Sequence, residues 1–133
     1  MKFSVSWPPK TANHAYFPRK SKYGGIYMFL VPEVREWRDN YIKLLPKIRF
    51  YPKNIDTHIK DVKFNFTYFP ADGNQAKSDS DNIDKLLRDL LQKAFKTNDR
   101  RFLVNQVDWI LDSSKSNGRI EVEIVEGRWE IAA

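Results

Sequence analysis

Two neighbouring segments with different periodicities decide the fold of this chain. Residues 62–68 read VKFNFTY, in which apolar and polar side chains alternate as in a β-strand with one buried face. Residues 82–95 read NIDKLLRDLLQKAF, in which apolar residues recur at helical spacing with charged residues opposite them. A polar loop over residues 70–80 joins the two segments. The sequence therefore predicts a strand that leads into an amphipathic helix.

Shorter elements are expected on both sides of this pair, and proline, glycine and polar clusters separate them. They are a first strand at residues 2–6, a helix that Pro32 opens and Pro46 ends, a connection between Pro46 and Pro52, and two strands at residues 103–111 and 119–125 around a turn at residues 113–118. Together the patterns predict a single α+β domain over residues 1–133, with a mixed sheet and two main helices.

The composition restricts the class of protein. The 133 residues and 15.8 kDa suit one domain, and 41% hydrophobic residues can supply its core. The chain has no cysteine, which excludes disulfides, zinc sites built on thiolates and cysteine nucleophiles. No apolar run reaches the roughly 20 residues that span a bilayer, and the N-terminus lacks the apolar block of a signal peptide. We therefore expect a protein without membrane contact in the reducing environment of the cytoplasm.

The charge is distributed unevenly along the chain. Residues 1–78 contain 14 basic and 6 acidic side chains, a net charge of +8, whereas residues 79–133 contain 9 basic and 11 acidic side chains, a net charge of −2. A basic front half beside an acidic back half favours a polyanionic partner such as nucleic acid.

Residues 8–24 combine aromatic and basic side chains in a predicted loop or irregular hairpin. Such a mixture can stack on unpaired bases and bind phosphates, although a solvated basic loop would have the same composition. The candidates for contact with a nucleic acid are Asn13, Tyr16, Arg19, Lys20 and Lys22.

The residues best suited to catalysis lie where the polar loop enters the long helix. Asp79 and Asp81 project the same way if this segment is extended, and neighbouring carboxylates repel each other unless a cation lies between them. Mg²⁺ prefers such oxygen ligands, and Lys85, one helical turn after Asp81, could reach a phosphate beside Asn82. Asp99, just beyond the helix, is a candidate third ligand. The structural alternative is that these acids cap the helix and form a turn.

Taken together, these motifs resemble the RusA-type Holliday-junction resolvases, small endodeoxyribonucleases of bacteria and their phages. Asp79-x-Asp81-Asn82-x-x-Lys85 matches the family signature D-x-D-N-x-x-K. The flanking similarities are Trp7-Pro8-Pro9 followed by Asn13-His14-Ala15-Tyr16, the segment Trp37-Arg38-Asp39-Asn40, the acid Asp99, and Asn117-Gly118-Arg119-Ile120-Glu121-Val122, which is similar to the closing hairpin of the family.

The resemblance implies the roles of these residues. Asp79, Asp81 and Asp99 would hold Mg²⁺, for which Mn²⁺ can substitute, and Lys85 would lie beside the scissile phosphate. Lys77 would take over the phosphate contact of an arginine that family members carry before the first acid. The expected reaction is hydrolysis of branched DNA at four-way junctions in recombination and repair, which leaves a 5′-phosphate at each nick. The expected homodimer presents two equivalent sites to the two strands that must be cut.

Two other functions remain open on the sequence. A non-catalytic nucleic-acid-binding module explains the basic front half equally well, but it does not explain why three aspartates should gather near a phosphate. A related metal nuclease could act on another branched DNA or on RNA, since carboxylate–metal chemistry does not read the 2′-hydroxyl. Divalent ions should stabilise an enzyme against heat and leave a binding module nearly unchanged.

Overall fold

A computed structural model describes residues 1–9, 16–51, 60–70, 80–110 and 118–131 of the chain. Within these ranges it describes the backbone but not the side chains of Tyr16, Phe17, Arg19, Tyr27, Ser80, Asp81 and Asn82. The expected α+β class is confirmed, with a mixed sheet and two main helices.

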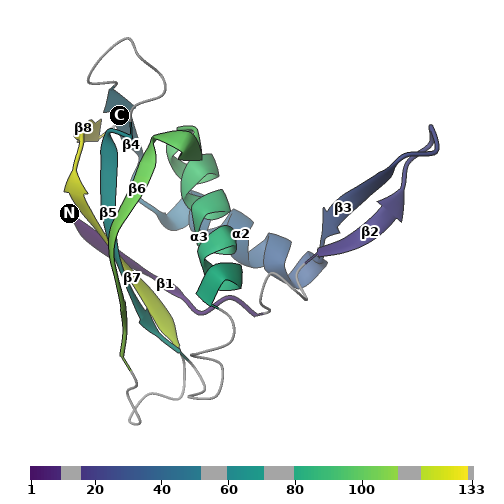
Figure 1. Ribbon diagram of the computed structural model, residues 1–133, viewed down its shortest axis with the longest axis horizontal. Helices are drawn as coiled ribbons and strands as arrows, with labels where there is room; N and C mark the ends of the chain where they lie inside the picture. The colour runs from purple at the N-terminus through teal and green to yellow at the C-terminus, as the bar shows by residue number, and fades with distance from the viewer. Residues whose placement is uncertain (10–15, 52–59, 71–79, 111–117, 132–133) are drawn as a thin grey trace.

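The strand and helix expected from the sequence open a β–α–β unit (Figure 1). Strand β5 (Val62–Phe69) precedes helix α3 (Ser80–Phe95), and strand β6 (Phe102–Trp109) then pairs with β5 in parallel. Parallel neighbours need a long crossover connection, which α3 provides. As a result, the N-terminal end of α3 and the carboxyl ends of β5 and β6 lie at the same end of the molecule.

The four-stranded sheet has the order β1-β7-β5-β6, in which β1 is Lys2–Ser6 and β7 is Arg119–Glu126. The two strands predicted around residues 113–118 both form, as β6 and β7, but they do not pair with each other, because β5 lies between them. The physical reason is burial. Strand β5 buries every second side chain and pairs on both sides, whereas β6 is mostly exposed and suits the sheet edge.

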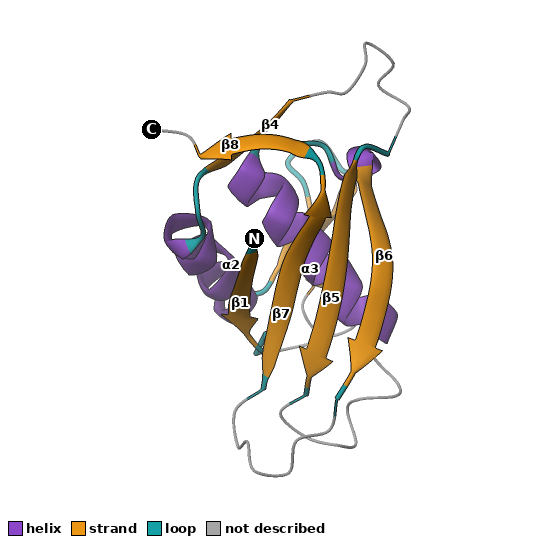
Figure 2. Cartoon of the chain, turned by 90° about the vertical axis from the view of Figure 1, so that its left-hand side faces the viewer, coloured by secondary structure: helices purple, strands orange, loops and turns teal. Residues whose placement is uncertain are grey.

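Helix α3 covers one face of this sheet, and the other face is open (Figure 2). Its apolar side is fully buried at Ile83, Leu87, Leu90 and Leu91, and each such residue stabilises the fold by about 1.5–3 kcal/mol. The sheet contributes the aromatic rings of Phe64, Phe66, Tyr68 and Phe102 to the same core. The apolar side chains that give β5 and α3 their periodicities therefore pack together in one core.

Helix α2 (Pro32–Leu44) confirms the predicted shorter helix, including its start at a proline. It attaches the first strand to the core through two side chains. The indole Nε1 of Trp37 donates to the carbonyl oxygen of Ser6 at 3.1 Å, and the hydroxyl of Tyr41 accepts from the Ser6 backbone N–H at 2.8 Å. An ion pair between Arg38 and Asp89, at 3.5 Å, links α2 to α3.

Of the two structures expected for residues 8–24, a loop or an irregular hairpin, the hairpin is found in the described part, which begins at Tyr16 and extends beyond residue 24. Strands β2 (Tyr16–Lys20) and β3 (Ile26–Leu30) form an antiparallel hairpin that projects from the body of the molecule (Figure 1). Its turn contains Gly24 at φ +87°, a conformation that favours glycine. At the base of the hairpin, the guanidinium of Arg35 lies 4.8 Å from the ring centre of Phe29 and connects β3 to α2.

The predicted connection between Pro46 and Pro52 also contains a strand. Strand β4 (Ile48–Tyr51) pairs antiparallel with β8 (Arg128–Ile131) in a second small sheet. Ile48 and Phe50 are buried beside the C-terminal end of α3, so packing rather than local pattern forms this short pair. None of the helices in the described ranges has the length and apolarity needed to cross a membrane.

Candidate functional site

The predicted catalytic motif lies at the start of α3. Asp81 and Asn82 belong to its first turn, and Lys85 is exposed one turn further along. Asp79 lies outside the described residues, and the described part of Asp81 and Asn82 is their backbone. This end of α3 adjoins the carboxyl ends of two parallel strands, the position at which open α/β sheets bind their ligands.

Beneath this end of α3 lies a buried phenol that the sequence did not single out. The Tyr68 hydroxyl finds no hydrogen-bond partner among the described residues, and the residue is only 1% exposed. Burial raises the pKa of Tyr68 well above its ordinary value, the Asp84 carboxylate raises it further, and Arg88 opposes them. The phenol therefore stays protonated at neutral pH and keeps its capacity to donate.

An aromatic cluster surrounds this phenol. The Tyr68 ring stacks on Trp109, with ring centres 4.6 Å apart, and Trp7 packs edge-on against both rings, at 6.2 Å from Tyr68 and 6.1 Å from Trp109. The cluster joins β5, β6 and the residue that follows β1, which gives the motif a rigid apolar base. Tyr68 stood out in the sequence only as the last apolar residue of the alternating strand.

Asp99 lies at the opposite end of α3 from Asp81. The 16 residues of α3 span about 24 Å, and Asp99 follows the C-terminal end in the short helical turn η2 (Asp99–Arg101). The side-chain oxygen Oε1 of Gln92 accepts from the Asp99 backbone N–H at 3.2 Å and holds the turn against this end. The structure therefore does not bring Asp99 and Asp81 to one metal ion within a chain.

The remaining candidate metal ligands are Asp79 and Asp81. The donor atoms of both are carboxylate oxygens, which suit Mg²⁺. Among the side chains that the structure describes, no three acids or histidines converge on a common point.

The proposed substrate contacts are spread over the front half of the chain. Lys20 and Lys22 are exposed on the β2–β3 hairpin, and the backbone of Tyr16 and Arg19 belongs to β2. Asn13 and Lys77 lie outside the described residues. The hairpin also exposes three large apolar side chains, Tyr23 at 96%, Ile26 at 78% and Met28 at 61%.

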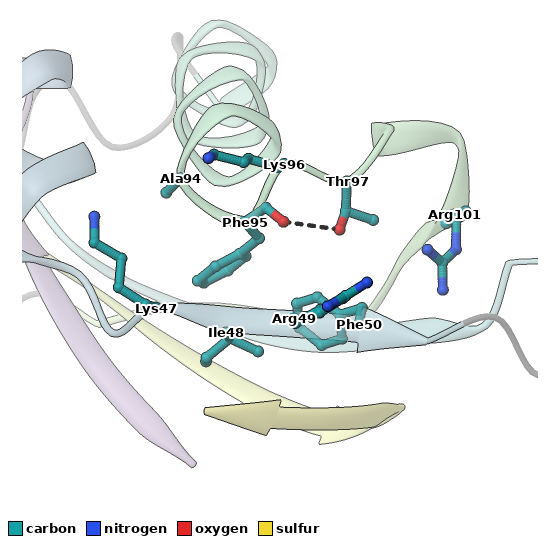
Figure 3. Close-up of a pocket in the computed structure, with 9 residues that line it drawn as sticks. All are labelled: Lys47, Ile48, Arg49, Phe50, Ala94, Phe95, Lys96, Thr97 and Arg101. Atoms are coloured by element: carbon teal, nitrogen blue, oxygen red, sulfur yellow. Dashed lines mark hydrogen bonds between the residues drawn. The ribbon is translucent and has the colours of Figure 1, made fainter. Parts of the chain in front are cut away.

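The C-terminal end of α3 carries a cavity of about 510 Å³ (Figure 3). Its wall is apolar and its surroundings are cationic. The lining residues come from β4 and the residue before it, from the end of α3 and from η2. The apolar ones are Ile48, Phe50, Ala94 and Phe95, and the cationic ones are Lys47, Arg49, Lys96 and Arg101, together with Thr97.

Local backbone geometry builds this cavity. Lys96 adopts φ +50° directly after the helix, the left-handed conformation that terminates helices and is usually taken by glycine. The Thr97 backbone N–H then donates to the carbonyl oxygen of Gln92 at 3.2 Å, and its hydroxyl donates to that of Phe95 at 3.0 Å. Arg101 is fixed by two parallel hydrogen bonds to the buried Asp61 carboxylate, at 2.9 and 2.8 Å.

The sequence did not reveal this cavity, because its cations come from segments that are far apart in the chain. Lys47 and Arg49 lie in what the prolines marked as a connection, and Lys96 and Arg101 follow the helix. The only local signal was the alternation of basic and apolar residues over positions 47–50.

The chain matches no protein-family model and no curated protein.

Proposed function

We propose that this protein is a Mg²⁺-dependent endodeoxyribonuclease that acts on branched DNA, four-way junctions in particular. The observation that carries the proposal is the location of residues 80–85 at the start of α3. This segment lies beside the carboxyl ends of β5 and β6, above the aromatic cluster of Tyr68, Trp109 and Trp7. The start of a helix favours negatively charged groups, so both the acids and a DNA phosphate are stabilised there.

In this proposal Asp79 and Asp81 hold Mg²⁺ and Asn82 contributes a neutral donor and acceptor. When bound, the ion polarises a phosphoryl oxygen and lowers the pKa of a bound water. Lys85, exposed on the same side one turn later, offsets the negative charge that develops on the phosphate. Asp99 has no part in the site of its own chain.

The β2–β3 hairpin supports DNA as the substrate. A two-stranded ribbon fits the major groove, and the exposed Lys20 and Lys22 can neutralise phosphates. Exposed apolar side chains such as Ile26 and Met28 can pack against bases that are unstacked at a branch. A homodimer would supply one such arm and one catalytic motif for each strand to be cut.

A nicking assay tests the proposal directly. A synthetic four-way junction and a matched linear duplex are incubated with wild-type protein or Asp81→Asn, in Mg²⁺ or in EDTA. We expect cutting of the junction that requires Mg²⁺ and is lost in the variant, while junction binding in EDTA is retained. Tight junction binding without cutting in any divalent ion would contradict the nuclease.

A non-catalytic DNA-binding module is the second candidate, and the separation of Asp99 from Asp81 favours it. If Asp99 is not a ligand within the same chain, the acids at the start of α3 can be explained as a helix cap. Mg²⁺ should then leave the melting temperature of the protein nearly unchanged, whereas the nuclease should be stabilised by the ion it binds.

A further inference from the structure

The cavity at the C-terminal end of α3 combines an apolar wall with cationic side chains. One wall is formed by Ile48, Phe50, Ala94 and Phe95, and the rings of Phe50 and Phe95 meet edge to face at 5.4 Å. Cationic side chains surround this wall (Figure 3). A volume of about 510 Å³ lies within the roughly 300–1,000 Å³ typical of small-molecule sites. A single phosphate ion would leave the apolar wall uncovered.

The cationic charge at the cavity is only partly neutralised by the residues that the structure describes. Asp61 pairs with Arg101, and Glu130 lies directly across the strand pair from Arg49. Lys47 donates to the carbonyl oxygen of Ile42 at 2.8 Å, and neither Lys47 nor Lys96 has a carboxylate partner among the described residues. Two ammonium groups therefore remain for an anionic ligand.

The helix dipole does not account for this arrangement. Cations near a helix C-terminus interact favourably with its carbonyl groups. Lys93 is exposed in the last turn of α3 and can make this interaction, but it does not line the cavity. Lys96 instead adopts a left-handed backbone that disfavours every side chain except glycine, asparagine and aspartate. The lysine at this position is therefore strained relative to a glycine, and its side chain lines the cavity.

We infer that this cavity binds a nucleotide whose base is not stacked in a duplex. The base packs against Phe50, Phe95 and Ala94, and the phosphate is bound by Lys47 and Lys96. The same chemistry is offered by a free nucleotide and by an unpaired nucleotide within a DNA strand. The inference goes beyond the proposed nuclease and does not depend on it, because the cavity lies at the other end of α3 from the metal motif.

Calorimetric titration in EDTA tests the inference with thymidine 5′-monophosphate, thymidine and inorganic phosphate as probes. We expect the nucleotide to bind with a Kd below about 1 mM, and each of the two fragments to bind at least about tenfold more weakly. EDTA excludes metal-dependent cutting, so a failed titration and a failed nuclease assay are separate results.

Two variants and a matched control locate the binding. Lys96→Gly removes the ammonium group and suits the left-handed backbone, so we expect a melting temperature no lower than that of the wild type and about tenfold weaker nucleotide binding. Ala94→Leu fills the apolar wall without a change of charge and should weaken the nucleotide but not inorganic phosphate. Lys93→Ala, on the same helical turn outside the cavity, should bind the nucleotide like the wild type.

A fluorescent oligothymidylate distinguishes the two sources of the ligand. If Ala94→Leu weakens the oligonucleotide as well as the mononucleotide, the cavity holds a nucleotide of a strand. If it weakens only the mononucleotide, the cavity holds a free nucleotide. The inference is overturned if the wild type does not bind the mononucleotide, if Lys96→Gly binds it unchanged, or if phosphate binds as tightly and Ala94→Leu has no effect.

Discussion

The two ends of α3 differ in charge, and the difference follows the helix dipole. The acids Asp81 and Asp84 lie in the first turns at the N-terminal end, and the cation Lys93 lies in the last turn at the C-terminal end. Each of these charges stabilises the helix where it lies, typically by a few tenths of a kcal/mol to about 1 kcal/mol. The charges alone therefore carry no function. Function must be inferred from features that do not stabilise the helix. These are the buried Tyr68 phenol at one end and the apolar-walled cavity at the other.

The ends also differ in how their ion pairs are held. At the N-terminal end Arg88 and Asp84 form a pair one turn apart on the helix surface, at 2.8 Å, with both side chains about one-third exposed. At the C-terminal end Arg101 and Asp61 come from different segments, and the Asp61 side chain is only 6% exposed. The second pair links segments 40 residues apart in the chain, whereas the first joins residues of one helix and contributes little to stability.

The largest expected effect is on junction cutting, in which substitutions at the two ends of α3 should differ. Asp81→Asn should reduce Mg²⁺-dependent junction cutting by more than about a thousandfold, because it removes an anionic metal ligand. Asp99→Asn should leave cutting within a few-fold of the wild type, because α3 separates Asp99 from the motif. Single-turnover cleavage rates compare the two variants. Loss of cutting in Asp99→Asn would mean that Asp99 reaches the motif from a second copy of the chain.

The next effect compares the two ion pairs by stability. Asp61→Ala should lower the free energy of unfolding by about 3 kcal/mol, because Arg101 is left largely buried without its partner. Asp84→Ala should lower it by no more than about 0.5 kcal/mol, because its partner Arg88 is accessible to water. Urea denaturation of both variants measures the difference. Equal losses would mean that the two ion pairs contribute equally to stability.

The hairpin offers a third basic region against which the ends of α3 can be compared. Replacing Arg19, Lys20 and Lys22 with alanine should weaken junction binding about tenfold. It should also reduce the slope of log K against log salt concentration by up to about 2.7, if all three neutralise phosphates. Anisotropy titrations at several salt concentrations give this slope. An unchanged slope would show that the three side chains contact only solvent.

The smallest effect concerns the buried phenol. Tyr68→Phe should raise the free energy of unfolding by about 1 kcal/mol at pH 7, because it removes a buried hydroxyl that has no partner among the described residues. Above pH 10 the unfolded phenol ionises while the folded one, whose pKa is raised, keeps its proton. Wild-type stability should then fall by up to about 1.4 kcal/mol per pH unit more steeply than that of the variant.

Unfolding curves of both proteins between pH 7 and pH 11 check this prediction. A loss of stability in Tyr68→Phe at pH 7 would mean that the hydroxyl has a partner beyond the described residues.

The sequence predicted those elements whose own pattern is strong. The alternation at residues 62–68 and the helical spacing at 82–95 appear as β5 and α3, and Pro32 begins α2 as expected. It did not predict β4 and β8, because four residues are too few to establish a period. It left open whether the segment that contains β2 is a loop or an irregular hairpin, because this segment is rich in proline and β2 itself contains Pro18. A proline disfavours a central strand but is tolerated in β2, which has β3 as its only neighbour within the described structure.

Within the candidate site, too, the sequence revealed the residues that are close in the chain but not the location of a distant one. The motif at the start of α3 could be found because Asp79, Asp81, Asn82 and Lys85 are close in sequence, and a helix start fixes their spacing. The position of Asp99 could not be judged from spacing. Its distance from the motif depends on the direction in which α3 carries the chain, and a continuous helix moves it away.

By itself, the sequence determined the α+β class and the strand and helix at the centre of the fold, and it predicted a metal motif at the start of that helix. These depend on local periodicity and on neighbours along the chain. The tertiary structure decided the sheet order, the separation of Asp99 from Asp81 and the cavity between β4 and the end of α3. These depend on contacts between residues tens of positions apart, such as Asp61 with Arg101. The local sequence pattern does not predict such contacts, because they depend on how well apolar faces pack and on whether buried charges are paired.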